Sequence, residues 1–164
     1  IRAILDLIPY GEDWRRAGEY LKQVLGDIGI KLELRYEDVP TWLKRIYHNY
    51  DFVMNVNYFY QLPDPVLGVH RHYGTDQIRK GTHFVNSSRY SNSELDELLA
   101  SGATEANAQK RTQIYKKIQE ILARDMPVVN LFELQFLTVY NTKLKGAYNS
   151  ALGAYASFSE AYLD

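Results

Sequence analysis

The stretch IRAILDLIPYGEDWRRAGEYLKQVLGDIGIKLELRY, residues 1–36, decides the fold class because three hydrophobic patterns follow one another in it. Residues 1–8 are mainly apolar and predict a strand. Residues 12–28 carry apolar side chains at helical spacing, and Gly29 stands where a helix end favours a left-handed backbone. Residues 30–36 alternate apolar and charged side chains, which is typical of a strand. Strand, helix and strand in this order predict a βαβ unit with a right-handed crossover.

The next segments extend the same alternation. A helix is expected over residues 39–48, because Asp38 can cap it and Pro40 is tolerated in its first turn. The run YDFVMNVNYFY, residues 50–60, predicts a third strand. Strands that alternate with helices predict the α/β class, with an open sheet flanked by helices.

The rest of the chain is less regular. Residues 61–92 are rich in Pro, Gly and His, and an irregular segment of this length is usually functional or packed on another body. Ser91 and Glu94 have the spacing of a capping box and predict a helix after Ser91. A longer helix is expected over residues 107–124, and the β-rich residues 128–140 predict a further strand.

Composition excludes several classes of function. The chain has 164 residues, the size of one ordinary domain, and its formal net charge of -1 argues against a nucleic-acid partner. It contains no cysteine, which excludes disulfides and thiolate metal sites and leaves the cellular compartment open. No apolar run reaches the roughly 20 residues of a membrane span.

Two groups of residues could support reaction chemistry, and each also has a simpler role. His70 and His72 form an H-x-H pair with His83 nearby, but positions two apart do not share a helix face, so no metal site is predicted. Carboxylates of residues 61–97 could serve a stand-alone hydrolase, with Asp64 and Asp96 as its candidates. The simpler role for Asp64 is to cap a short helix that begins at Pro65.

The segment YFYQLPDP, residues 58–65, is the leading candidate for a binding site. Ligands of open α/β sheets approach beyond the carboxyl ends of the strands, and Tyr58, Phe59, Tyr60 and Gln61 lie at or just past the carboxyl end of the third predicted strand. Tyrosine and phenylalanine rings supply rigid apolar area, and a hydroxyl or amide tip can orient a ligand. The alternative is that Tyr58 and Phe59 merely cover the edge of the core.

Six stretches, taken in order, resemble the family 5 extracellular solute-binding proteins of ABC importers, which include oligopeptide, dipeptide and nickel receptors. The stretches are LKQVLGDIGIKLEL, TWLKRIYHNYDFVMN, PDP, YSNSELDELL, KRTQIYKKIQEILARDMPVVNLFE and VYNTKLKG. The resemblance implies a type II periplasmic-binding-protein-like lobe. It also implies that residues 1–164 are the C-terminal, second lobe of a two-lobed receptor whose first lobe is absent from this chain.

Function and partners follow from the same resemblance. Such receptors capture a small molecule or peptide between two lobes by hinge bending, without catalysis or cofactor, and deliver it to the permease subunits in the membrane. They lie in the periplasm, or outside the cell tethered to the membrane. Two alternatives remain. One is a structural or regulatory lobe that has lost solute binding and only docks a partner, and the other is the hydrolase.

The resemblance also assigns residues. Peptide-binding members carry an aspartate that pairs with the α-amino group of the peptide, and Gln61 occupies that position here, three residues before Asp64. A neutral amide lacks the charge that strengthens such a contact, so this position does not specifically favour a peptide as the solute. Tyr58 stands where those members have a tryptophan. Further residues expected to face the cleft are Asn86 and Arg89.

Overall fold

The computed structural model describes residues 1–135, 137–148, 150, 152 and 155–164. Its central element is a parallel sheet of β1 (Arg2–Leu7), β2 (Lys31–Arg35) and β3 (Met54–Val56) in the order β2-β1-β3. Leu5 of β1 lies opposite Leu34 of β2 and Met54 of β3. The predicted βαβ unit and the α/β class are therefore confirmed.

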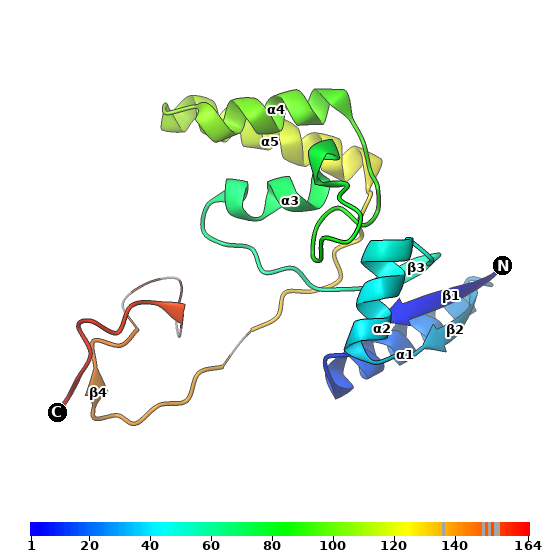
Figure 1. Ribbon diagram of the computed structural model, residues 1–164, viewed down its shortest axis with the longest axis horizontal. Coiled ribbons are helices and arrows are strands. Elements are labelled where there is room, and N and C mark those ends of the chain that lie inside the picture. Colours follow the sequence, from blue (N-terminus) through cyan, green and yellow to red (C-terminus); the bar gives the residue numbers. More distant parts are fainter. Residues whose placement is uncertain (136, 149, 151, 153–154) are drawn as a thin grey trace.

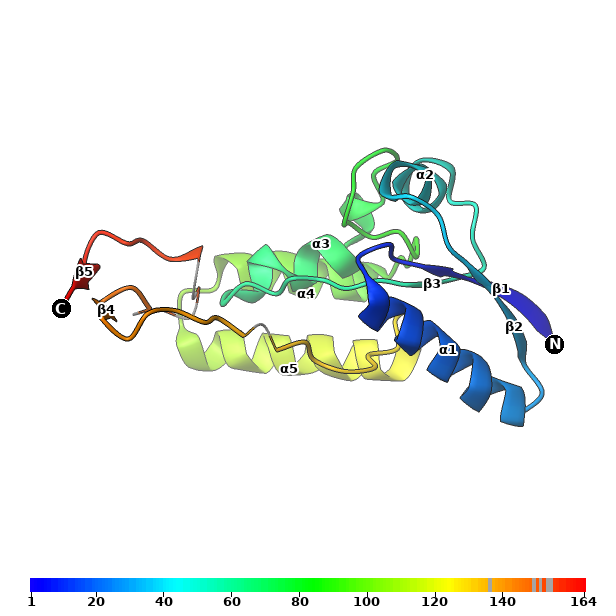
Figure 2. The same cartoon turned by 90° about the horizontal axis from the view of Figure 1, so that it is seen from below.

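Helices cover both faces of this sheet. Helix α1 (Glu12–Asp27) lies on one face, whereas α2 (Val39–Leu43) and the π-helical turn η1 (Lys44–Asn49) lie on the other, as Figure 2 shows. The chain moves outward from β1 to β2 and then crosses back to β3 on the other side of β1. The carboxyl ends of β1 and β3 therefore form a topological switch point, where ligands of open sheets bind.

One hydrophobic core lies around the sheet. Its buried apolar residues come from all three strands and from the helices on both faces: Leu5, Leu7, Ile8, Trp14, Leu32, Trp42, Ile46, Tyr47, Val56 and Val85. Helix α1 packs closely on β1 through Gly18, where an added Cβ would lie 2.5 Å from a methyl carbon of Leu7. The predicted left-handed residue after the helix is Gly29, with φ of 85°.

A second core lies between two later helices. Helices α4 (Ser93–Thr104) and α5 (Ala108–Asp125) run side by side and bury Leu95, Leu99, Ile118 and Ile121 between them (Figure 1). The short elements η2 (Pro65–Leu67), α3 (Val69–Tyr73) and η3 (Thr75–Gln77) precede this pair. The segment between β3 and α3 thus joins the two cores, and it contains four of the predicted ligand contacts, Tyr58, Phe59, Tyr60 and Gln61.

The capping residue of α4 differs from the prediction. Asn92, rather than Ser91, is the N-cap, and its side-chain oxygen accepts a hydrogen bond from the backbone N–H of Leu95 at 3.1 Å. The Ser91 hydroxyl instead accepts a hydrogen bond from the Thr75 hydroxyl. Both residue types cap helices well, so their order in sequence did not decide between them.

Two predicted strands also differ from the structure. The third strand is limited to Met54–Val56. Before it, Tyr50 takes a left-handed backbone with φ of 52°, and after it, the backbone N–H of Tyr58 donates to the side-chain oxygen of Asn57. Within residues 128–140, the described positions belong to no strand, and Phe136 lies outside the described residues. A strand needs a neighbouring edge for its backbone groups, however strong its β propensity.

The last part of the chain extends away from both cores (Figure 1). It contains a short antiparallel pair, β4 (Leu144–Lys145) with β5 (Tyr162–Leu163). None of the helices in the described part of the chain combines the length and the apolar character needed to cross a membrane.

Candidate functional site

An aromatic rim, formed by Tyr10, Trp14 and Tyr58, lies at the switch point. The ring of Tyr58 stacks on Trp14 with 5.5 Å between ring centroids, and Tyr10 meets Tyr58 edge-on at 5.8 Å. Tyr10 is 41% exposed, so the rim has an open side. Tyr10 is not among the predicted residues, although it follows the first strand as Tyr58 follows the third, and parallel strands end at the same edge of a sheet.

Tyr58 is held in place from inside the core. Asn57 donates a hydrogen bond from Nδ2 to the Tyr47 hydroxyl at 2.7 Å, and its Oδ1 accepts one from the backbone N–H of Tyr58 at 2.8 Å. Tyr47 is fully buried, and this burial raises its pKa to about 12. A buried neutral phenol therefore anchors the start of the candidate site, and Tyr58 both covers the core edge and forms part of the rim.

Phe59 and Tyr60 continue toward the second core. The Phe59 ring lies against the His72 ring, with 3.6 Å between centroids. Tyr60 is 38% exposed, and its carbonyl oxygen accepts a hydrogen bond from Arg71 at 2.9 Å. Its ring meets that of Tyr155 edge-on at 6.0 Å. Phe59 is thus half-buried and Tyr60 is exposed.

Gln61 is exposed, and its amide contacts Nδ1 of His72 at 3.0 Å. His72 is only 4% exposed, and Arg71 donates a hydrogen bond to its Nε2 at 3.2 Å. Burial, followed by the positive charge of Arg71, lowers the pKa of His72 to about 3. His72 is therefore a neutral ring at physiological pH, and the Gln61 amide rests on it.

Asp64 takes the capping position predicted for it, with Pro65 as the first residue of η2. Its Oδ1 accepts hydrogen bonds from the backbone N–H of Val66 at 2.9 Å and from Arg111 of α5 at 2.8 Å. The Arg111 hydrogen bond, then that of Val66, lowers the pKa of Asp64. Asp64 thus ties the segment after Gln61 to the helical core.

Asn86 and Arg89 do not join the rim. Asn86 is 1% exposed, and its amide donates to the carbonyl oxygens of Gly74 at 3.1 Å and Tyr90 at 2.8 Å. Its expected place facing a cleft is therefore corrected to one inside the chain, where it organises a loop. Arg89 is exposed and has a left-handed backbone, and its guanidinium lies 5.3 Å from the centre of the Tyr50 ring.

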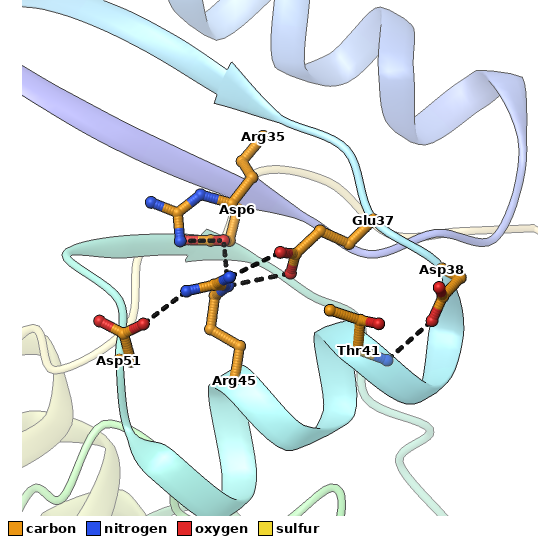
Figure 3. A network of polar contacts seen from close by, with 7 residues as sticks. All are labelled: Asp6, Arg35, Glu37, Asp38, Thr41, Arg45 and Asp51. Carbon is orange, nitrogen blue, oxygen red and sulfur yellow. Dashed lines mark hydrogen bonds and ion pairs between the residues drawn. The ribbon is translucent and has the colours of Figure 1, made fainter.

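A network of charged side chains lies between the sheet and η1 (Figure 3). Asp6 of β1 is fully buried and lies 3.4 Å from Arg35 and 3.7 Å from Arg45. Arg45 also donates two hydrogen bonds to Glu37 and pairs with Asp51. Burial raises the pKa of Asp6, although both guanidinium groups act in the opposite direction. This network ties β1 and β2 to η1 and was missed in the sequence.

The carboxylates considered for a hydrolase form structural hydrogen bonds instead. Asp64 is held by Arg111, and Asp96 accepts a hydrogen bond from the backbone N–H of Thr75 at 2.9 Å. Each therefore has a partner in the fold.

The histidines are separated as the helical spacing predicts. His70 contacts the Tyr115 hydroxyl at 3.0 Å, whereas His72 contacts Gln61. His83 instead faces His48, with 3.3 Å between their Nε2 atoms. Among the described residues, no group of three side chains has the arrangement of a metal site.

Comparisons with known proteins agree with this architecture. No family model matches the chain. The peptide transport periplasmic protein SapA of Haemophilus influenzae is 24% identical over 151 residues, which are 90% of this chain and 26% of SapA. AppA from Clostridium difficile has a TM-score of 0.80 at 24% identity, covering 99% of this chain and 33% of that chain.

A third similar protein is the mannohexaose-bound periplasmic oligopeptide-binding protein of an ABC transporter from Thermotoga maritima. It has a TM-score of 0.69 at 22% identity, covering 77% of this chain and 24% of that chain. The chain therefore spans about a quarter of the length of SapA and a similar share of these structures. In sequence and in fold, the chain is therefore similar to the family 5 extracellular solute-binding proteins.

Proposed function

We propose that this chain is the second lobe of a two-lobed solute-binding protein of an ABC importer. Its wall of the solute site would consist of the aromatic rim with Phe59, Tyr60 and Gln61. The single observation that carries this proposal is the position of the partly open aromatic rim at the switch point between β1 and β3. Rings held there offer apolar area to a ligand at little cost in conformational entropy.

The apolar tail, meaning the described residues of 126–140, supports the two-lobed arrangement. Leu137 is 91% exposed, Val139 is 96% exposed and Phe132 is 56% exposed. Exposed apolar area that is contiguous usually marks a surface covered by another body. We propose that a first lobe covers the tail and supplies the opposite wall of the site.

The proposed activity is capture without chemistry. The solute binds between the lobes, the lobes close by a hinge motion, and the permease subunits in the membrane receive the solute. This role belongs on the outer side of the membrane, in the periplasm or tethered at the cell surface. SapA is named as a periplasmic peptide transport protein, which supports the same side and a peptide as one class of solute.

The test is a binding measurement on the full-length protein with a panel of short peptides and oligosaccharides. Replacing Tyr58 and Tyr60 together by alanine should weaken the best-binding probe by at least about 30-fold, since buried tyrosines are common hot spots of about 2 kcal/mol or more. The control is Tyr20→Ala on α1, because Tyr20 is 64% exposed and lies outside the rim. Equal affinities of the double variant and the control would overturn the proposal.

A further inference from the structure

Two histidines face each other on the surface, and neither belongs to the aromatic rim or to the segment that carries Gln61. The Nε2 atoms of His48 and His83 lie 3.3 Å apart, and their ring centroids lie 5.5 Å apart with 54° between the ring planes. Both side chains are exposed, so an ion in solution can reach the pair. The fold thus brings together two ring nitrogens of a kind that commonly binds metal ions, from positions 35 residues apart in the chain.

The segments that carry the two histidines are fixed to each other. His48 lies in the last turn of η1, and the loop that carries His83 runs beside this turn (Figure 2). The backbone N–H of Gly81 donates a hydrogen bond to the carbonyl oxygen of Tyr47 at 2.8 Å. Phe84, the next residue after His83, packs on the sheet core, and its ring lies 5.7 Å from that of Tyr47. The pair is therefore anchored on both sides, although the histidine rings themselves are exposed.

Gly81 makes room for the His48 ring. Its backbone is left-handed, with φ of 86°, and an added Cβ would lie 3.3 Å from Cε1 and 3.5 Å from Nδ1 of His48. On the other side of the pair, the His83 ring lies 5.8 Å from the Tyr47 ring. Each imidazole thus has a neighbour that limits its position, and the glycine allows the loop to pass close to His48.

The spacing of the two nitrogens matches that of two ligands of a tetrahedral zinc ion. With Zn–N bonds of about 2.0–2.1 Å, two nitrogens at the tetrahedral angle lie about 3.3–3.4 Å apart. Adjacent positions of a square-planar or octahedral ion with bonds of the same length would lie only about 2.8–3.0 Å apart. The observed 3.3 Å therefore fits tetrahedral zinc without a change in spacing.

We propose that His48 and His83 bind Zn²⁺ through their Nε2 atoms, with water in the two remaining positions. Without the metal, one ring donates a hydrogen bond to the other, because two N–H groups or two lone pairs at this distance would repel. When zinc binds, the donating ring releases its Nε2 proton to solvent and takes up a proton at Nδ1. Both rings are then neutral, and both Nε2 lone pairs are free for the ion.

The bound ion would connect η1 to the loop that carries His83. Two protein ligands are fewer than the three or four of catalytic and structural zinc sites, so the ion should exchange readily with solution. The proposal involves no residue of the solute site. It is therefore tested without solute, and its failure would leave the proposed function unaffected.

Calorimetric titration of the full-length protein with zinc chloride tests the site. His48→Gln and His83→Gln should each lower the affinity for one equivalent of zinc by at least about tenfold. Because a chelating pair acts as a unit, the double variant should lose no more than either single variant. The control is His70→Gln, which should keep this equivalent because His70 contacts the Tyr115 hydroxyl instead. Mg²⁺, which prefers oxygen ligands, should not bind to the pair.

Two outcomes of this titration would overturn the proposal. Unchanged zinc binding in both single variants would show that the pair is not a zinc site. Losses that add in the double variant would show that the two rings bind adventitious ions independently of each other.

A second pair of variants tests whether the placement of the rings matters. Gly81 and Gly29 both have a left-handed backbone, with φ of 86° and 85°, but no atom lies within 4 Å of the missing Cβ of Gly29. Gly81→Ala should therefore weaken zinc binding by at least about tenfold, whereas Gly29→Ala should not. Equal zinc affinities of the two variants would contradict a preformed pair.

Nitrogen-15 NMR of the two histidine rings provides a readout that does not depend on affinity. In the zinc-saturated full-length protein, both rings should carry their proton on Nδ1 and show a metal-bound Nε2. A proton on Nε2 of either ring under these conditions would overturn the proposal, even if the variants fold poorly.

Discussion

At the scale of single residues, the candidate site depends on supporting side chains that are buried or half-buried. Tyr58 is oriented by Asn57, which is itself anchored on the buried phenol of Tyr47. Gln61 is oriented by His72 in the same way. Exposed contact groups placed on buried supports lose less conformational entropy on binding than free side chains do. This arrangement suits a binding wall and requires no reacting group.

His72 should also make stability depend on pH. Its folded-state pKa is about 3, below the ordinary value near 6.5, so the neutral ring is the form that stabilises the fold. This contribution is complete above about pH 6.5 and is lost as the pH falls toward 3. Lowering the pH from 7 to 4.5 should therefore reduce the free energy of unfolding by about 2–3 kcal/mol through His72.

Urea denaturation at the two pH values measures this cost, and His72→Gln provides the comparison. The variant has no group that titrates at this position, so its stability should fall less between the two pH values than that of the unaltered protein. An equal fall in both proteins would show that His72 is not buried as a neutral ring.

At the scale of elements, the close packing of α1 on β1 requires that Gly18 has no side chain. Gly18→Ala would place a methyl group against the buried Leu7, and overpacking of this kind costs about 1–3 kcal/mol. Gly26 lies in the same helix with no atom near its missing Cβ, so Gly26→Ala should gain up to about 1 kcal/mol.

Chemical denaturation of the two variants separates packing from helix propensity. Both substitutions improve propensity, and only one of them meets a neighbour, so Gly18→Ala should be the less stable by about 1–3 kcal/mol. Equal stabilities would mean that Leu7 moves aside freely, and that α1 does not pack on β1 as tightly as described.

The predicted elements differ in how well they match the structure, and the differences have a common origin. Helix α1 and strand β2 follow patterns that are complete within their own residues. The strand expected over residues 50–60 shrinks to Met54–Val56, and that expected over 128–140 has no ladder at its described positions. Pairing depends on a partner strand, which a local pattern does not reveal.

At the scale of the whole molecule, the site segment joins two separate cores. It leaves β3 beside the sheet core and runs to α3 beside the helical core (Figure 1). Asp64 within it accepts a hydrogen bond from Arg111 of α5. Movement of one core relative to the other would therefore displace the rim residues relative to Gln61. The apolar tail touches the sheet core at Phe132, whose ring lies 6.3 Å from that of Trp14, and its residues Leu137 and Val139 are almost fully exposed.

Limited chymotrypsin digestion should reveal this exposure. In the 164-residue chain alone, early cleavage is expected after Phe132, Leu134, Leu137 or Tyr140, because these residues are exposed and belong to no described strand. The fragment that retains α5 should resist further cleavage. In the full-length protein the same sites should be protected, and equal rates of cleavage in both would contradict a covering first lobe.

The sequence by itself determined the α/β class, the βαβ unit and the cap at Asp64, because periodicity and capping depend on residues close together in the chain. It also placed Tyr58 and Gln61 beyond a strand end. Only the tertiary structure decided that Tyr10 joins Tyr58 and that Gln61 rests on His72. It likewise showed that Asn86 lies inside the chain. These contacts join residues that are distant or differently oriented along the chain, and packing alone brings them together.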